Sequence, residues 1–222
     1  MAAAVASSAR IRAAPVAALL AGIALAACDS GLPAQGQEPH DFYVLAISWS
    51  PSYCAAEGDS ANRGQCEARP GHGYVVHGLW PQYEEGWPEF CEPGDEAWVA
   101  DDLVSEMLDI MPSPGLVGHQ WRKHGSCSGL SQEDYFALTR AAFDRITLPS
   151  PSSATVAPDD LERSVIELND GLQPGAMAVT CDGEFLREIR ICMEADLEFR
   201  PCPEVASRAC TLDTARMPPV PR

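Results

Sequence analysis

The chain has 222 residues, of which 46% are apolar, 15 are basic and 32 are acidic, so its formal charge at pH 7 is −17. This composition excludes a disordered or collagen-like chain, and the length suits one domain or at most two. The large excess of acidic side chains argues against a protein that binds nucleic acid through a generally basic surface.

Residues 1–27 have the features of a signal peptide. Arg10 and Arg12 precede an apolar stretch from Ala13 to Ala27, which at about 15 residues is too short for a comfortable membrane span. A buried N-terminal helix fits an alanine-rich run behind two arginines less well. We therefore expect export, and a mature chain that begins near residue 28.

The end of this segment, Leu25-Ala26-Ala27-Cys28, resembles a bacterial lipobox, in which the cysteine is diacylated and becomes the new N-terminus. Ordinary signal cleavage after a nearby small residue is the alternative. The number of cysteines favours lipidation, because an even set of eight is left once Cys28 is used. The expected location is the bacterial periplasm or outer surface, with a lipid at Cys28 as the only membrane link.

The eight other cysteines of an exported chain predict four disulfides. They contain no Cys-x-x-Cys pair, so the sequence disfavours zinc ligation by cysteine. Sequence alone leaves their pairing open. These cysteines are Cys54, Cys66, Cys91, Cys127, Cys181, Cys192, Cys202 and Cys210.

The rest of the chain predicts a single α+β domain. Residues 28–40, rich in Gly, Pro and Gln, suit a flexible tether, and the fold is expected to occupy residues 41–222. Strands gather at both ends of this domain and helices lie between them. The expected strands are Phe42 to Ser50, Gly73 to Tyr83, Ala176 to Cys181 and Glu184 to Met193. The expected helices are Asp95 to Met111, a helix capped by Ser131, and Asp159 to Leu168.

Three of the five histidines lie in two short segments, His77-Gly78-Leu79-Trp80-Pro81 and His119-Gln120-Trp121-Arg122-Lys123-His124-Gly125. If the second segment is helical, positions 119, 120, 123 and 124 share one polar face and Trp121 turns away from it. Two imidazoles, an amide and an ammonium group on one surface suit an anionic transition state. His77, at the end of a strand, is a candidate for a second proton-transferring group.

The histidines have two other interpretations. A zinc-binding helix needs histidines at i and i+4 with a glutamate between them, whereas His119 and His124 are i and i+5 and Gln120 follows the first. Histidines that only satisfy hydrogen bonds in a core would not explain both segments together. The sequence therefore predicts no metal site.

The two histidine segments, the second extended through Ser126 and Cys127, resemble the active-site signatures of the RNase T2 family of secreted, acid-tolerant endoribonucleases. The segment from Ile47 to Cys54 also resembles the first strand of that family. The agreement runs from about Asp41 to Cys127 in motif, and to Cys210 in the layout of cysteines.

This resemblance implies a central, mainly antiparallel sheet with helices packed against it and a reaction that needs no metal. We expect a monomer without a cofactor. It also implies cleavage of single-stranded RNA by its own 2′-hydroxyl, which leaves a 2′,3′-cyclic phosphate and spares DNA. By analogy, His124 is the general base, His77 is the general acid, His119 holds the phosphate and Lys123 stabilises its extra negative charge.

The chain departs from the family pattern at two positions. Gln120 stands where the family usually has glutamate, and Gln82 stands where many members have aspartate, next to Trp80 at the base-binding pocket. Trp80 is a candidate for stacking on a base, with a core role as the alternative. Base preference is therefore not predicted.

The resemblance also implies how the cysteines pair: Cys54 with Cys66, Cys91 with Cys127, Cys181 with Cys210, and Cys192 with Cys202. An alternative function stays open, namely a catalytically weakened relative that binds RNA or a partner outside the cytoplasm. Gln120 and the strongly acidic composition favour this alternative, whereas a pure binding protein would not need His77 and His124 as a proton-transfer pair.

Overall fold

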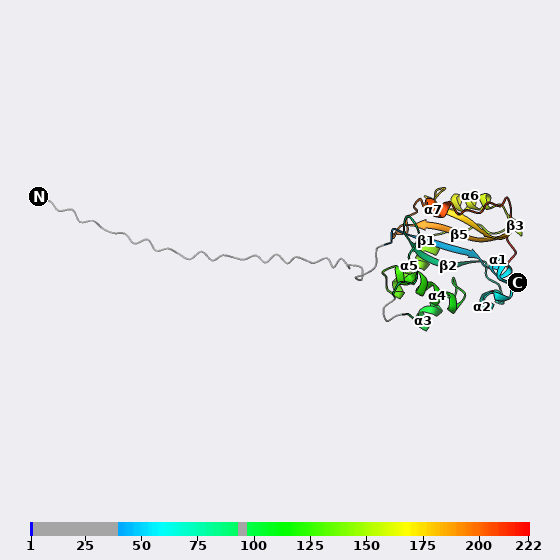
Figure 1. Ribbon diagram of the computed structural model, residues 1–222, viewed down its shortest axis with the longest axis horizontal. Helices are drawn as coiled ribbons and strands as arrows, with labels where there is room; N and C mark the ends of the chain where they lie inside the picture. The colour runs from blue at the N-terminus through cyan, green and yellow to red at the C-terminus, as the bar shows by residue number, and fades with distance from the viewer. Residues whose placement is uncertain (2–39, 93–96) are drawn as a thin grey trace. The chain divides into compact units, whose positions relative to one another are not determined.

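The computed structural model describes Met1, residues 40–92 and residues 97–222 (Figure 1). The expected leader from residue 2 onward, the candidate lipidation site Cys28 and the tether up to residue 39 lie outside these residues. Within the described parts of the chain, no helix combines the length and the apolar composition needed to cross a bilayer.

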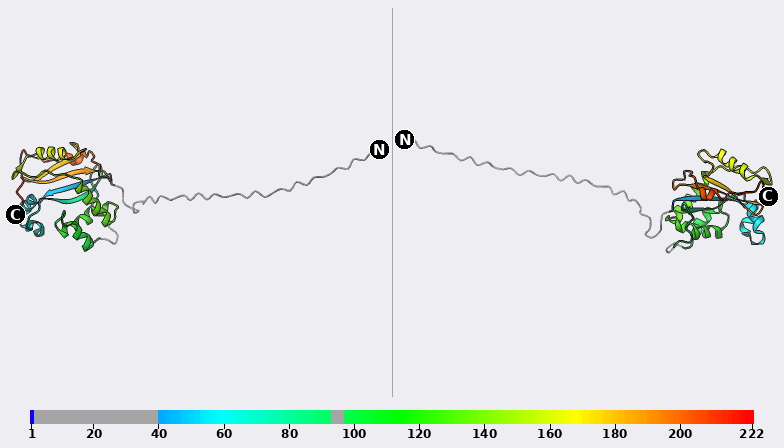
Figure 2. Two further views of the ribbon diagram at one scale, coloured as in Figure 1. Left: turned by 180° about the vertical axis from the view of Figure 1, so that it is seen from behind. Right: turned by 45° about the horizontal axis from the view of Figure 1, so that its top comes forward.

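A mainly antiparallel sheet forms the centre of the fold. Its four long strands lie in the order β2 (Tyr74–Gln82), β1 (Phe42–Trp49), β5 (Phe185–Met193) and β4 (Met177–Asp182), and all three neighbouring pairs are antiparallel. Two short strands, β6 (Ala215–Arg216) and β3 (Thr155–Val156), extend the sheet, and β6 runs parallel to β5. The strand expectations are confirmed to within one residue at each end. Strands from opposite ends of the domain sequence, β1 and β5, therefore lie side by side (Figures 1 and 2).

Helix α4 packs over β2, α5 packs over β1 and β2, and α6 and α7 pack against β4. The α-helices are α1 (Ser50–Glu57), α2 (Arg63–Cys66), α3 (Asp101–Met107), α4 (Pro114–Lys123), α5 (Gln132–Asp144), α6 (Pro158–Leu168) and α7 (Pro203–Ala206), and the 3-10 helices are η1 (Gly58–Ser60) and η2 (Gly125–Cys127). Together these elements confirm the α+β fold that the sequence predicts.

Serine caps fix the starts of the two helices nearest the site. The Ser113 hydroxyl accepts a hydrogen bond from the Leu116 backbone N–H at 3.3 Å, and Pro114 occupies the first turn of α4. Ser131 caps α5 as expected, by accepting from the Asp134 N–H at 3.1 Å. Each cap satisfies a backbone donor that has no partner inside its helix.

The helix expected from Asp95 to Met111 is wrong in its extent. Helix α3 begins at Asp101 and ends at Met107, and Trp98, which the expected helix includes, precedes α3 and is 83% exposed, while Asp95 and Glu96 lie outside the described residues. Asp101 and Asp102 place negative charge in the first turn, which the positive end of the helix dipole stabilises. The first residue of α3 is therefore set by the acidic pair Asp101 and Asp102, and not by the spacing of apolar residues that begins at Trp98.

The sheet separates a large core from a small one because side chains alternate along β1. Leu45 and Ile47 belong to the large core, together with Trp121 of α4 and Tyr135 of α5. On the opposite face, a smaller cluster contains six buried residues, with Trp80 packed against it. Those six are Phe42, Val44, Ala178, Cys192, Cys202 and Val205.

A β-bulge in β2 sets the direction of His77. Ala46 of β1 pairs with Gly78, and the next residue, Ile47, pairs with Val76, so His77 has no partner on β1. The bulge lets both Val76 and Leu79 reach the large core although they are three residues apart. His77 is thereby turned to the opposite face of the sheet, where the cleft described below lies.

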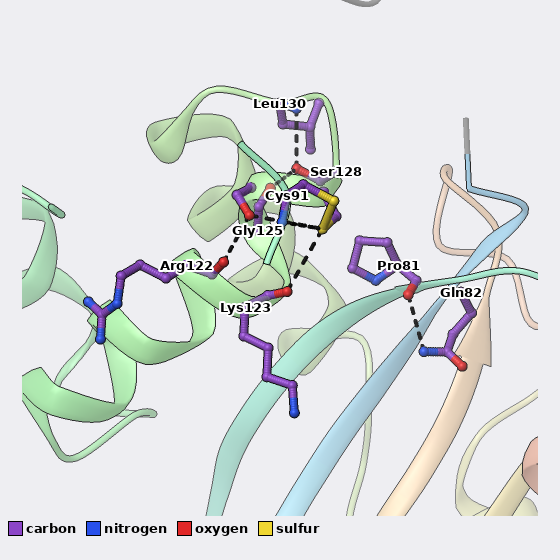
Figure 3. The surroundings of a disulfide bond; sticks show 10 residues. Pro81, Gln82, Cys91, Arg122, Lys123, Gly125, Ser128 and Leu130 are labelled. Atoms are coloured by element: carbon purple, nitrogen blue, oxygen red, sulfur yellow. Dashed lines mark hydrogen bonds between the residues drawn. A yellow bond between two sulfur atoms is a disulfide. The ribbon is translucent and has the colours of Figure 1, made fainter. Parts of the chain in front are cut away.

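The structure contains four disulfides, which join Cys54 to Cys66, Cys91 to Cys127, Cys181 to Cys210, and Cys192 to Cys202. These are the pairs that the resemblance implies. The Cys91–Cys127 bond ties the loop after β2 to the end of the α4 region, close to the second histidine motif (Figure 3).

Candidate active site

A cleft of about 270 Å³ brings the two histidine motifs together. The first motif lies on β2 and the second at the end of α4, and both contribute side chains to its wall. All seven residues expected at the catalytic and base-binding sites line it: His77, Trp80, Gln82, His119, Gln120, Lys123 and His124. Trp87, Arg190, Glu204 and Arg208, which the sequence analysis did not include, also line it.

The second motif is helical up to its final histidine. Residues 119–123 belong to α4, and His124 caps the helix, with its backbone N–H donating to the Gln120 carbonyl at 2.9 Å. Trp121 is 3% exposed and lies in the large core, where its ring is 5.8 Å from that of Tyr135. The polar face of the helix therefore lines the cleft, and its aromatic face anchors it to the core.

His77 is held by a buried carboxylate. Its Nδ1 lies 2.5 Å from Oε1 of Glu188, a residue of β5 that is 1% exposed. Because Nδ1 is engaged there, Nε2 is the ring nitrogen left for a substrate. The His77 side chain is 30% exposed, which gives a substrate access to it.

Glu188 also binds Arg190. The Arg190 Nε and Nη2 atoms donate to Oε2 of Glu188 at 3.0 and 2.9 Å. Burial alone raises the pKa of Glu188, but the hydrogen bond and charge of His77, together with Arg190, lower this pKa to about 2. The carboxylate is therefore ionised over the whole neutral and mildly acidic range.

His124 lies deeper than His77, at 5% exposure. Burial, followed by the positive charges of Lys123, His77 and His119, lowers the pKa of His124 to about 3. Its Nδ1 is one of two buried side-chain atoms in the described residues that have no hydrogen-bond partner. A neutral imidazole has one ring nitrogen that can accept a proton.

Lys123 and His119 are the more accessible groups of the second motif. The Lys123 Nζ lies 3.4 Å from Oε2 of Glu89 and 5.9 Å from the ring centre of Phe90. Burial and then the charges of Lys123 and Arg122 lower the pKa of His119. The Phe90 backbone N–H donates to the Lys123 carbonyl at 2.9 Å, which ties the loop after β2 to the helix end.

Trp80 stands between the two histidine motifs. Its ring stacks on His124 with 5.3 Å between ring centres and meets the edge of His77 at 5.2 Å. The indole Nε1 donates to Oε1 of Gln120 at 2.8 Å. A side chain at Gly78 would overlap both the Gln120 amide and the indole, so this motif position requires glycine. Trp80 is thus fixed in the wall of the cleft.

The wall near Gln82 carries charge as well as apolar surface. Gln82 is 7% exposed, and its Nε2 donates to the Pro81 carbonyl at 3.1 Å. Glu204 accepts from the Gly86 backbone N–H at 2.7 Å and from Arg208 at 2.5 Å. The Arg208 guanidinium lies 5.1 Å from the centre of the Trp87 ring. The flat ring of Trp87 therefore lies close to the hydrogen-bonded pair of Arg208 and Glu204.

A second hollow, of about 250 Å³, adjoins the cleft and shares His77 and His119 with it. Its lining includes polar side chains from β1, the α2 region and the start of α4, namely Ser48, Asn62, Gln65 and Ser113. The pair of histidines thus lies where two hollows meet.

Comparisons with known proteins agree with this arrangement. Residues 40–202 match the model of the Ribonuclease T2 family. A ribonuclease of Aeromonas hydrophila is 42% identical over 113 residues, which are 50% of this chain and 48% of that protein. An RNase-related protein from Calystegia sepium has a TM-score of 0.63 over 82% of this chain and 98% of its own, at 18% identity. RNase NT, solved in complex with 5′-AMP, has a TM-score of 0.56 over 75% of this chain and 92% of its own, at 23% identity.

This chain spans about half the length of the bacterial ribonucleases of Aeromonas and Haemophilus that it matches. The similarity to solved structures extends over most of the domain and shows the same fold. The family model spans both histidine motifs, the strand that carries Glu188 and most of the paired cysteines. On this match the chain belongs to the Ribonuclease T2 family.

Proposed function

We propose that the protein is a metal-independent endoribonuclease that cleaves single-stranded RNA through the 2′-hydroxyl group of the RNA. The observation that carries this proposal is that His124 and His77 lie in one cleft but differ in their burial and in their charged neighbours. His124 is buried with a pKa lowered to about 3, and His77 is accessible and bound to the Glu188 carboxylate. One group is suited to accept a proton and the other to donate one.

In the proposed reaction, His124 takes the proton of the 2′-hydroxyl, and the 2′-oxygen forms a bond to phosphorus. His77 gives its Nε2 proton to the 5′-oxygen as the bond from phosphorus to that oxygen breaks. The products are a 2′,3′-cyclic phosphate end and a free 5′-hydroxyl. Lys123 and His119 donate to the phosphate oxygens, on which negative charge develops. DNA has no 2′-hydroxyl and is not a substrate.

The two adjoining hollows support cleavage within a chain. An endonuclease must hold a nucleotide on each side of the phosphate that it cleaves, and the cleft and the second hollow meet at His77 and His119. Trp80 and Trp87 offer aromatic surface in the cleft, and bases of single-stranded RNA stack on such side chains. RNase NT, which has the same fold, was solved with a bound nucleotide.

The charge of the cleft supports a polyanionic substrate despite the net charge of −17. Lys123, Arg190 and Arg208 line the cleft together with three histidines, and each of these three cations is also paired with a carboxylate. Cations in the cleft attract a phosphate at short range, whereas dissolved counterions screen the acidic side chains elsewhere on the surface.

A weakened relative that binds RNA or a partner without cleavage is the second candidate. Gln120, in place of the usual family glutamate, is the observation that favours it. However, Gln120 hydrogen-bonds Trp80 and preserves the wall of the cleft. His77, His119, Lys123 and His124 all line that cleft. Catalysis therefore remains the function that the site supports best.

We also propose that the protein is exported and monomeric, and that Cys28 carries a lipid. Four disulfides support an oxidising compartment. In a bacterial host, Cys28→Ser is expected to release the protein from the membrane fraction. Mass spectrometry that finds an unmodified N-terminus at another residue would contradict lipidation and favour simple signal cleavage.

The direct test is incubation of the purified protein with single-stranded RNA, and with DNA of the same sequence, in excess EDTA. RNA should be cut and DNA should stay intact. His77→Ala and His124→Ala should each remove nearly all turnover, whereas His72→Ala, outside the cleft, should not. A requirement for metal, equal cutting of DNA, or near-native kcat in His124→Ala would overturn the proposal.

A further inference from the structure

We propose that Glu188 is a positioning residue that holds the His77 ring so that Nδ1 keeps a proton and Nε2 faces the scissile bond. This inference rests on the proposed function, in which His77 is the general acid. Glu188 lies 111 residues from His77 in the sequence and touches no reacting atom in the proposed mechanism. It acts through the histidine.

The contact is built into the register of the sheet. Glu188 of β5 pairs with Ser48 of β1, and β1 separates β5 from β2, which carries His77. The Ser48 side chain is small and lies beside the carboxylate, with its hydroxyl 3.4 Å from Oε1. Glu188 can therefore reach across β1 to the bulged histidine. A larger residue at position 48 would fill this path.

The partners of Glu188 divide between its two oxygens. Oε2 accepts two hydrogen bonds from Arg190, whereas Oε1 faces His77 at 2.5 Å, with the Ser48 hydroxyl at 3.4 Å and Nε of Arg187 at 3.8 Å. Arg190 alone would be enough to neutralise a buried carboxylate whose role was only structural. The second oxygen is instead directed at His77, a ring that is open to both hollows.

The chemical consequence concerns the two forms of the imidazole. Before transfer, His77 carries protons on both nitrogens, and the Glu188 carboxylate accepts from Nδ1–H. After Nε2 gives its proton to the leaving 5′-oxygen, the neutral ring keeps its remaining proton on Nδ1. The carboxylate thus selects the tautomer in which Nε2 is free to be protonated again from solvent.

Arg190 connects this pair to the wall of the cleft. Its guanidinium lies 5.3 Å from the centre of the Trp80 ring, and Trp80 meets the edge of His77. His77 is therefore bounded by a carboxylate on one side and by an aromatic ring on another. Such a boundary restricts rotation of the imidazole and keeps Nε2 in one direction.

The first test is Glu188→Gln, with Glu198→Gln as the matched control. Glu198 pairs with Arg145 on the surface and does not line either hollow. On a dinucleoside phosphate, Glu188→Gln should lower kcat on the order of 10²-fold, because a misdirected acid loses much of its contribution, while KM changes little. On a nucleoside 3′-(4-nitrophenyl phosphate), whose leaving group needs no proton, kcat should fall less than about 3-fold.

An equal loss of kcat on both substrates would overturn the proposal, because general damage to the site does not depend on the leaving group. Unchanged kcat on the dinucleoside phosphate would overturn it as well. Thermal unfolding of both variants shows whether the glutamine is tolerated, and Glu188→Asp, which keeps the charge but is shorter, should show the same dependence on leaving group.

The second test does not need activity. Nitrogen-15 NMR of the His77 ring at alkaline pH should show Nδ1–H in the wild type and Nε2–H in Glu188→Gln, where the amide can donate to Nδ1. If the wild type failed to cleave RNA but showed the Nδ1–H form, the proposed function would be wrong and the positioning contact would stand. An Nε2–H form in the wild type would overturn the positioning role itself.

Discussion

The Nε1 atom of Trp80 donates a hydrogen bond to the side-chain oxygen of Gln120 at 2.8 Å, and this contact joins the two histidine motifs. Gln120 is 1% exposed, so the oxygen has no access to bulk water. The sequence places the amide on the polar face that suits an anionic transition state. In the structure the side-chain oxygen of Gln120 also anchors Trp80, whose ring stacks on His124.

Gln120→Glu should therefore keep the enzyme active, because a carboxylate oxygen can accept the same hydrogen bond from Trp80. The added negative charge should raise the pKa of His124 from its lowered value of about 3 and weaken binding of the anionic substrate. The acid limb of the pH profile of kcat/KM should move upward and KM should rise.

Gln120→Leu is the matched control, since it has no acceptor and leaves the indole N–H without a partner. Its unfolding free energy should fall by about 1–3 kcal/mol. If Gln120→Glu instead raised kcat by orders of magnitude without moving the profile, the glutamine would be a lesion. The interpretation of the protein as a weakened enzyme would then gain support.

His119→Ala should act mainly on substrate binding. In the proposed mechanism His119 donates to the phosphate and moves no proton, so KM should rise about 10-fold, the value of one hydrogen bond to a charged group. Steady-state kinetics on a dinucleoside phosphate should show kcat within a few-fold of the wild type. A loss of kcat as large as that of His124→Ala would instead place His119 in proton transfer.

Stability should depend on pH through His124. Its pKa is about 3 in the folded protein against 6.5 for an exposed histidine, so below pH 6.5 the unfolded chain binds a proton that the folded chain does not. Stability due to this group therefore falls as pH falls from about 6.5 towards 3. Between pH 7 and pH 5 the loss is on the order of 2 kcal/mol.

Chemical denaturation of the wild type and of His124→Gln at both pH values measures this effect. The glutamine variant should lose less stability than the wild type over the same interval. Equal losses would mean that His124 is not held neutral by the fold. Glu188 adds a separate loss at lower pH, because its folded pKa of about 2 lies below the 4.5 of an exposed glutamate.

The sequence predicted the fold and the seven motif residues of the cleft better than the groups that orient them. The strands were readable because β1 is apolar on both faces, and the helical spacing of positions 119–124 placed the polar face of α4 correctly. Glu188 was missed because its contact with His77 depends on the pairing of β5 with β1 and on the bulge in β2. One signal was present: Glu188 and Arg190 place two charges on the same face of β5, and the strand carries only one further charged residue, Arg187.

The Cys91–Cys127 disulfide should contribute to substrate binding as well as to stability. It holds the loop in which Glu89 and Phe90 contact Lys123. Replacement of both cysteines by serine should lower the unfolding free energy by about 4 kcal/mol and raise KM.

Replacement of Cys181 and Cys210 is the matched control, because that disulfide closes a loop of similar length, 29 residues against 36, away from the cleft. It should cost similar stability, about 4 kcal/mol, without a change in KM. The same rise in KM in both double variants would show that lost stability, rather than the position of Lys123, is responsible.

In the proposed mechanism the 2′-hydroxyl is the nucleophile, His124 takes its proton and His77 gives a proton to the leaving 5′-oxygen. The most direct measurement is phosphorus-31 NMR of dinucleoside phosphates incubated with the protein in EDTA, beside the same compounds methylated at the 2′-oxygen. We predict a 2′,3′-cyclic phosphate signal from the unmodified compounds and none from the methylated ones. Cleavage of the methylated compounds, or a linear phosphate formed with no cyclic intermediate, would contradict the mechanism.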